Sequence, residues 1–200
     1  MHYSREQTDM ITSSNNAKVK QVVQWQTKAK ERRKDHVFLA EGVRMCEEAP
    51  VKSVREVYLT EELEQKLRRN AQNGDTAFWD KLQPTGYETV SPEVFAKMAD
   101  TQTPQGILTV LEQPSYDLTQ LLEQPEPLFL ILENLQDPGN LGTMIRTGEG
   151  AGITGVIMNQ QTVDIFNPKT IRATMGSIFR VPFVYVPELS TVLTQMHERG

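Results

Sequence analysis

The most informative part of the chain is residues 128–150, LFLILENLQDPGNLGTMIRTGEG. A nearly continuous apolar run opens the segment and is typical of a parallel strand that is covered on both faces. A polar loop with glycine and proline follows, and a helix is expected from about residue 143 to 151. This order predicts an α/β domain in which the loop binds a phosphate or nucleotide, because N–H groups at a helix start point toward the ligand.

The alternation of strands and helices extends to both sides of this segment. Apolar residues at positions 189, 192, 193 and 196 have helical spacing and predict an amphipathic closing helix, which Gly200 is suited to cap. The whole pattern favours an α/β fold over an all-α or all-β one. Further strands are predicted at 37–39, 54–59, 87–90, 106–111, 155–159 and 181–186, and further helices at 17–34, 41–48, 61–72, 92–98, 118–122 and 168–175.

The length of 200 residues allows one large domain or two small ones, and the composition is typical of a soluble globular protein. Prolines surround one short helical run in residues 112–126, which we predict to be a linker between domains at 12–111 and 127–200, after a disordered tail at 1–11. No run of eighteen apolar residues exists, so a membrane-spanning helix is excluded. Cys46 is the only cysteine and the three histidines are scattered, so we expect no metal site and a cytoplasmic location.

The formal net charge of −5 is unevenly distributed along the chain. Residues 1–36 contain eight Lys and Arg against four Asp and Glu, whereas the rest contains thirteen against twenty-two. This asymmetry predicts a basic N-terminal surface for a polyanion such as RNA, with a merely solvated helix face as the alternative. The candidate RNA contacts in this region are Lys28, Lys30, Arg32, Arg33 and Lys34.

The loop after the apolar run contains neither of the familiar glycine patterns for nucleotides, GxGxxG and GxxxxGK[ST]. It contains Asn140, and Arg146 follows in the expected helix near the loop. A guanidinium at this place suits bidentate capture of a phosphate. The alternative is that Asn140 merely closes the loop and Arg146 pairs with a nearby carboxylate such as Glu149.

This loop and helix resemble the first motif of the SpoU (TrmH-type) RNA 2'-O-ribose methyltransferases of the SPOUT superfamily. The resemblance continues in NPKTIRATMGSIFRVPF at 167–183. Upstream, FLAEGVR at 38–44 and TPQGIL at 103–108 are similar to signature phrases of that family's substrate-binding domain, which has the ribosomal protein L30e-like fold. The resemblance therefore implies an L30e-like α/β sandwich domain followed by the N-terminal part of a SPOUT α/β (trefoil-knot) methyltransferase domain.

The resemblance also implies an activity, namely methyl transfer from S-adenosylmethionine to a ribose 2'-hydroxyl of ribosomal or transfer RNA, without a metal. Asn140 and Arg146 match the asparagine and arginine of motif one and are the expected catalytic residues. We expect Arg146 to clamp the target phosphate rather than accept a proton, because an arginine pKa above about 12 makes a poor base. Arg172 is a further candidate RNA contact, and a homodimer is expected.

The chain departs from the family after residue 187, where neither the Gly-x-Glu phrase of motif two nor the Ser-Leu-Asn phrase of motif three occurs. These motifs form the knot that holds S-adenosylmethionine. We therefore expect a chain truncated before the knot, weakly active or inactive, with the main cofactor pocket C-terminal to Gly200, and assign no cofactor-binding residue. An RNA-binding module without catalysis is the alternative function. An ordinary doubly wound nucleotide-binding enzyme is a third candidate, which the missing glycine pattern disfavours.

Overall fold

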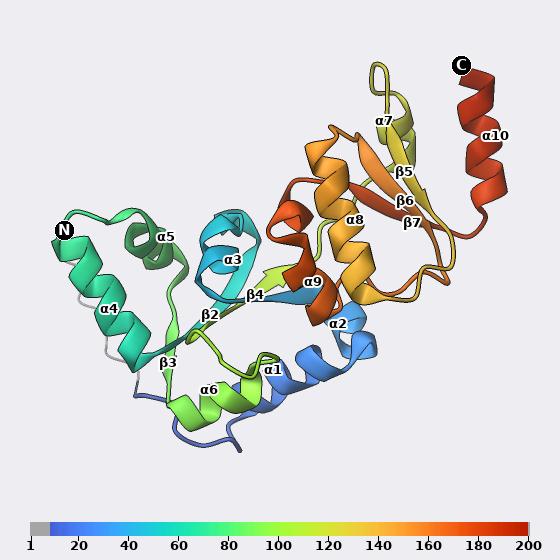
Figure 1. Ribbon diagram of the computed structural model, residues 1–200. Coiled ribbons are helices and arrows are strands. Elements are labelled where there is room, and N and C mark those ends of the chain that lie inside the picture. The colour runs from blue at the N-terminus through green and yellow to red at the C-terminus, as the bar shows by residue number, and fades with distance from the viewer. Residues whose placement is uncertain (1–8, 200) are drawn as a thin grey trace. The chain divides into compact units, whose positions relative to one another are not determined.

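The computed structural model describes residues 9–199 and divides into two units, one up to Glu112 and one from Gln113 (Figure 1). Both units are of the α/β class, so the predicted class is confirmed. The first unit contains α1 (Ala17–Thr27), α2 (Ala29–Asp35), β1 (Val37–Glu41), α3 (Val43–Glu48), the 3-10 turn η1 (Val51–Ser53), β2 (Val54–Thr60), α4 (Glu61–Gln72), α5 (Ala77–Thr85), β3 (Glu88–Val90), α6 (Pro92–Met98) and β4 (Ile107–Glu112).

The sheet of the first unit has the strand order β1-β4-β2-β3. Strand β4 is antiparallel to β1 and β2, whereas β3 is parallel to β2. Helices α1 and α6 cover one face, where Val22, Tyr58 and Phe95 are fully buried, and α3, α4 and α5 lie on the other face (Figure 1). Helix α5 was not predicted from the sequence.

Ile11 is ordered, although the sequence predicts it to lie in a disordered tail. Residues 1–8 of the expected disordered tail lie outside the described residues, but Ile11 is part of the sheet edge. Its N–H donates to the Thr89 carbonyl over 2.9 Å, and its carbonyl accepts from the Ser91 N–H over 3.0 Å. The prediction of disorder up to residue 11 was therefore wrong, because Ile11 extends the parallel pairing beside β3.

The long helix predicted at 17–34 is broken in two. Lys28 is extended, with φ −123° and ψ 109°, and separates α1 from α2. The Arg32 guanidinium reaches back and donates to the carbonyls of Trp25 and Gln26 over 2.7 and 3.3 Å. A helix end needs partners for its last carbonyls, and Arg32 supplies them, so α1 ends here.

The second unit contains a parallel sheet with the order β5-β6-β7. Strand β6 is buried along its whole length, but β5 is half-buried and Leu128 before it is 52% exposed. Among the described residues β5 pairs with β6 alone, so β5 is an edge strand, and the full burial predicted from its apolar run is reached only at Leu132. The elements are α7 (Leu118–Leu122), β5 (Phe129–Leu132), α8 (Pro138–Gly150), β6 (Gly155–Asn159), α9 (Pro168–Thr174), the 3-10 turn η2 (Ser177–Phe179), β7 (Phe183–Val186) and α10 (Leu189–Arg199).

Helices α7 and α10 pack on one face of this sheet, and α8 and α9 lie on the other (Figure 1). Leu121 of α7 and Val192 of α10 share a core cluster with Ile157 and Val184 of the sheet. The segment predicted to be a linker therefore belongs to the second unit from Gln113 onward, because α7 contributes to its core. None of the helices in the described part of the chain is long and apolar enough to cross a membrane.

The amphipathic closing helix expected from the sequence is α10, which is described as far as Arg199. Gly200, the residue expected to cap this helix, lies outside the described residues. The expectation of a main cofactor pocket C-terminal to Gly200 likewise concerns a region outside the described residues. Both therefore stay predictions, whereas the helix itself is confirmed.

Candidate active site

The loops that follow β5 and β6 are tied together at the carboxyl ends of these parallel strands. Asn159, which is 6% exposed, donates from Nδ2 to Asn134 Oδ1 over 2.8 Å and accepts from the Asn134 N–H over 3.0 Å. Its Oδ1 also accepts from the Thr162 hydroxyl over 2.8 Å. These hydrogen bonds fix the carboxyl edge of the sheet. This is the edge at which ligands of open α/β sheets bind.

Helix α8 begins in the middle of the segment that the sequence predicts to be a loop. Asp137 caps the helix, its Oδ1 accepting from the Asn140 N–H over 2.6 Å, and Pro138 occupies the first turn. Lys169 Nζ lies 3.9 Å from Asp137 Oδ2. The predicted start at residue 143 was therefore wrong, and Asn140 lies in the first turn of α8 with an exposed side chain. The helix therefore starts in the segment that follows the carboxyl end of β5.

Gly142 sets the close approach of α8 and α9. A Cβ at this position would lie 2.5 Å from Ala173 Cβ and 2.6 Å from the Thr170 carbonyl oxygen. Any larger residue would separate the helices, because neither neighbouring atom can rotate away. Asn167 caps α9, accepting from the Lys169 N–H over 2.9 Å. The start of α9 is thereby held beside the start of α8.

Arg146 is exposed on α8 and makes no hydrogen bond or ion pair with any residue between 9 and 199. The Arg146–Glu149 pair considered from the sequence is not formed, because Glu149 binds Arg180 and Ser177 instead. Asn140 and Arg146 lie about 120° apart around the helix, given about 100° per residue. Both side chains therefore project from the solvent side of α8.

The predicted RNA-binding residues do not all reach the surface. Lys28, Lys30, Arg33 and Lys34 are exposed at the turn between α1 and α2 and along α2, while Arg172 is half-buried on α9. Arg32 is 3% exposed and its guanidinium is committed to the end of α1. The inclusion of Arg32 among the phosphate contacts was therefore a mistake, and we leave it out of the set.

Two family phrases of the first unit meet through side chains that the sequence analysis did not single out. Glu41, which is 8% exposed, accepts from the Asp100 N–H over 2.8 Å and from the Thr101 hydroxyl. Gln105 Oε1 accepts from the Val43 N–H over 2.8 Å. The phrases FLAEGVR and TPQGIL therefore form one hydrogen-bonded structure. A charged residue in the buried run Val37–Glu41 was the available signal for Glu41.

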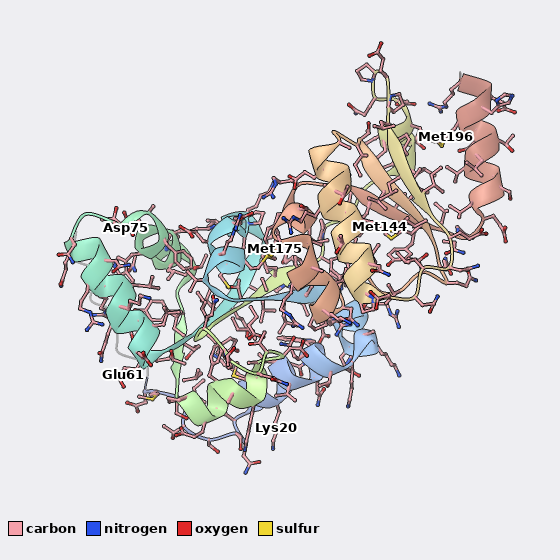
Figure 2. All side chains as sticks on the ribbon, in the orientation of Figure 1. Lys20, Glu61, Asp75, Met144, Met175 and Met196 are labelled. Atoms are coloured by element: carbon pink, nitrogen blue, oxygen red, sulfur yellow. The ribbon has the colours of Figure 1, made fainter. Side chains whose placement is uncertain are left out.

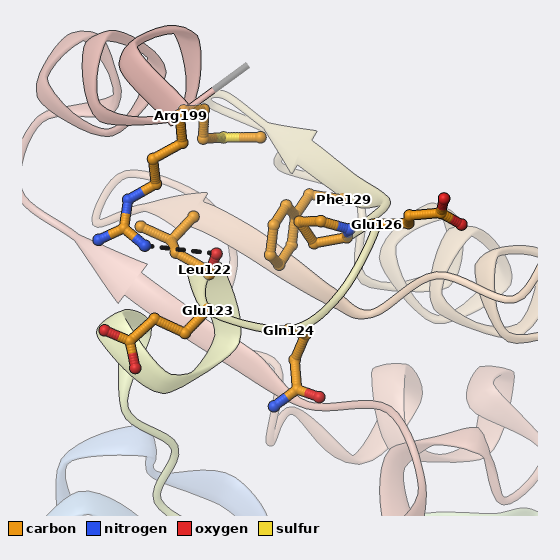
Figure 3. Close-up of a pocket in the computed structure, with 8 residues that line it drawn as sticks. Leu122, Glu123, Gln124, Glu126, Phe129 and Arg199 are labelled. Atoms are coloured by element: carbon orange, nitrogen blue, oxygen red, sulfur yellow. Dashed lines mark hydrogen bonds between the residues drawn. The ribbon is translucent and has the colours of Figure 1, made fainter.

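A cavity of about 720 Å³ in the second unit lies away from this edge of the sheet (Figure 3). It is bounded by the end of α7, the start of β5 and the end of α10, where the Arg199 guanidinium lies 3.5 Å from the Leu122 carbonyl oxygen. Phe129, at the amino end of β5, is part of its wall. The cavity is thus separate from the loops that follow β5 and β6, and we do not assign it to the site. No cluster of potential metal ligands occurs in residues 9–199.

Nearly the whole chain is similar to known proteins. The pattern of the SpoU rRNA Methylase family matches residues 127–200, and that of the MRM3-like substrate binding domain matches residues 16–109. The 23S rRNA (guanosine(2553)-2'-O)-methyltransferase RlmP of Bacillus subtilis is 36% identical over 188 residues, which cover 90% of this chain and 68% of that protein. Mitochondrial rRNA methyltransferase 3 of Homo sapiens is 41% identical over 118 residues, 56% of this chain and 28% of that protein.

The chain is also similar in fold to a solved structure of an rRNA methyltransferase. The AdoMet-bound rRNA methyltransferase from Sinorhizobium meliloti has a TM-score of 0.76 and 27% identity, covering 93% of this chain and 67% of that one. The expected fold and family are therefore confirmed, whereas the roles of single residues stay predictions. The chain spans about two thirds of the bacterial relatives and under a third of the human one. On the strength of both domain matches and the Bacillus relative, the chain belongs to the SpoU rRNA methylase family.

Proposed function

We propose that the protein carrying this chain transfers a methyl group from S-adenosylmethionine to a ribose 2'-hydroxyl of ribosomal RNA. The observation that carries the proposal is the exposed Arg146, which has no hydrogen-bond or ion-pair partner among residues 9–199. It lies on the helix that starts at the carboxyl edge of the sheet, in a chain of the SpoU family. Ribosomal rather than transfer RNA is the substrate named for the Bacillus and human relatives.

The cofactor proposal rests on the rigid loops at the carboxyl edge. A main-chain hydrogen bond of 2.8 Å joins Val163 N–H to the Leu135 carbonyl, and both residues are half-buried. These loops combine half-buried apolar side chains with main-chain groups that are held in place. Such a surface fits one side of a nucleoside-containing ligand. When bound, S-adenosylmethionine supplies an electrophilic methyl group on a sulfonium. Leu135, Val163 and the loops that carry them fit one side of a cofactor site. We assign contact with the cofactor to these loops and to no other part of the chain.

The chain's own contribution to the reaction is orientation. Arg146 binds the phosphate next to the target ribose through its planar guanidinium, which matches two phosphate oxygens. Asn140, about 1.7 turns earlier on α8, offers an amide that hydrogen-bonds the ribose or its neighbour. Holding the hydroxyl oxygen, which accepts the methyl group, close to the methyl donor lowers the barrier by removing the entropy of alignment. The Asp137 cap and the Gly142 contact keep α8 fixed during this step.

The basic surface of the first unit supports RNA as the partner. We define the basic surface by its four exposed residues, Lys28, Lys30, Arg33 and Lys34. Cationic side chains at phosphate positions gain affinity by releasing counterions, without reading sequence. This surface therefore supplies general RNA affinity, and α8 supplies the contact at the modified nucleotide.

A homodimer and a cytoplasmic location complete the proposal. Met144 on α8 and Met175 after α9 are 38% and 40% exposed, and Figure 2 marks both. Exposed apolar side chains on the helices that carry the site suit an interface with a second copy. Light scattering after size-exclusion chromatography gives the mass that checks this state. Cys46 is the only cysteine of the sequence and is buried without a disulfide partner, and a chain without disulfides fits a reducing compartment.

The Arg146 role is tested by substitution. Arg146→Ala abolishes most methyl transfer to rRNA. Arg146→Lys also loses methyl transfer, because an ammonium cannot bind two phosphate oxygens in the bidentate geometry of a guanidinium. Arg69→Ala, which removes an exposed arginine of α4, is the control and retains activity. Methyl transfer by Arg146→Ala close to that of the control would overturn the assignment. Calorimetric titration with S-adenosylmethionine separates the enzyme from an RNA-binding module without catalysis, which would release no binding heat.

A further inference from the structure

Glu149 is the carboxylate best placed to compete with RNA for Arg146. The two residues are three positions apart on α8, and side chains at this spacing are neighbours on a helix surface. An arginine paired with a carboxylate has its guanidinium donors occupied and its charge neutralised. Arg146 therefore binds phosphate only as long as Glu149 is held elsewhere.

Both oxygens of Glu149 are held elsewhere by residues after α9. The Ser177 hydroxyl donates to Oε2 over 2.5 Å. Arg180 donates from Nε to Oε1 and from Nη2 to Oε2, the latter over 3.2 Å. Ser177 is 1% exposed, so its hydroxyl is fixed by the surrounding core. A bidentate guanidinium with a buried hydroxyl is a strong partner for one carboxylate.

The contacts with Arg180 and Ser177 also favour the charged form of Glu149. The Arg180 guanidinium and the Ser177 hydroxyl hold the pKa of the Glu149 carboxyl below its ordinary value. Glu149 is therefore a full negative charge at neutral pH. If it were released, it would repel RNA phosphates near α8 as well as attract Arg146.

We propose that Arg180 and Ser177 sequester Glu149, so that Arg146 stays available to bind an RNA phosphate. Arg180 is thus a positioning residue, which acts on the substrate through Glu149 and Arg146. This inference rests on the proposed function, because it assigns Arg146 to the phosphate. A simpler role for Arg180, as a clamp between α8 and η2, predicts a different outcome in a double variant.

The test compares Arg180→Gln, Glu149→Gln and their combination in the intact protein. Binding of a fluorescein-labelled single-stranded RNA 12-mer is measured by anisotropy, beside the KM and kcat of rRNA methylation. Arg180→Gln weakens RNA binding about two- to fivefold, the range for competition by one exposed ion pair. It raises the KM for RNA and leaves kcat unchanged. Adding Glu149→Gln restores the affinity to the wild-type level, because the competing charge is gone.

Several outcomes would overturn the inference. If the combined variant binds RNA no better than Arg180→Gln, Arg180 is only a clamp between α8 and η2. Arg180→Gln with wild-type affinity would likewise refute it. Arg180→Lys keeps the charge but cannot bind Glu149 in the bidentate geometry, so it gives an intermediate loss of RNA affinity. It replaces Arg180→Gln in the test if that variant fails to fold. Arg146→Gln and the wild type separate the two levels: unchanged RNA binding and methylation in Arg146→Gln refute the role of Arg146, whereas an absence of methyl transfer by the wild type refutes the proposed function itself.

Discussion

Gly142→Ala tests the contact that places α8 against α9. The added methyl group would lie 2.5 Å from Ala173 Cβ and 2.6 Å from the Thr170 carbonyl oxygen, both too short for any real contact. One of these atoms is main chain and the other is the first atom of a side chain. Neither can turn aside, so α9 has to move relative to α8.

The expected loss of stability follows from two opposing effects. Replacing glycine by alanine inside a helix favours folding by about 1 kcal/mol. Inserting a methyl group into a packed interface costs about 1–3 kcal/mol. With no flexible neighbour to give way, the cost lies in the upper part of that range. We therefore expect Gly142→Ala to lower the free energy of unfolding of the second unit by about 1–2 kcal/mol.

Urea denaturation measures this change, with a matched control on the same helix. Gly150 has nothing within 4 Å of its expected Cβ position, so Gly150→Ala raises stability by about 0.5 kcal/mol. Circular dichroism follows both units. Fluorescence follows only the first, because Trp25 and Trp79 both lie there, and it stays unchanged in both variants. A Gly142→Ala protein as stable as the wild type would refute the close-packing argument.

Three more perturbations follow from the described contacts. Asn159→Ala leaves the Asn134 N–H without its partner and lowers stability by about 1–3 kcal/mol in the same urea assay; an unchanged midpoint would show that the loops hold without it. Because Arg180 and Ser177 depress the folded-state pKa of Glu149, its contribution is present above the unfolded pKa of about 4.3 and is lost as pH falls through the folded value. Glu149→Gln therefore flattens the acid side of the stability profile, and an identical profile would contradict this. Neutralising the basic surface lowers the salt slope of RNA binding by up to about 3, and an unchanged slope would make these residues a solvated face; the substitutions are Lys28→Gln, Lys30→Gln, Arg33→Gln and Lys34→Gln.

Elements with strong local signals could be predicted from the sequence. Helix α4 has the predicted bounds because Thr60 caps it and Leu63 and Leu67 form its buried stripe. The bounds of α7 also agree, with Asp117 as the cap. Strand β6 is where its apolar run predicts. In each case the residues that define the element lie within the element or directly before it.

Features that depend on distant partners could not be predicted. The break at Lys28 exists because Arg32 binds the carbonyls of the preceding helix, which no periodicity reveals. The exposure of β5 depends on which strands pair with it. The start of α8 had a local signal, since Asp137 and Pro138 are a typical cap and first residue, but the surrounding glycines favoured a loop.

The candidate site shows the same division. Asn140 and Arg146 could be identified from their motif. That Arg146 is unpaired could not, because it depends on Glu149 binding Arg180, 31 residues further along the chain. The Asn134–Asn159 pair joins the loop after β5 to the last residue of β6, 25 residues further along the chain, and likewise could not be predicted.

The position of the transferred methyl group tests the central claim most directly. The protein is incubated with rRNA and S-adenosylmethionine labelled in the methyl group, and the RNA is then hydrolysed in alkali. Alkaline cleavage uses the 2'-hydroxyl as the nucleophile, so a 2'-O-methylated nucleotide stays joined to its neighbour. Label in alkali-resistant dinucleotides, absent with Arg146→Ala, is the result we predict. Label in mononucleotides, or equal labelling by Arg146→Ala, would contradict the account.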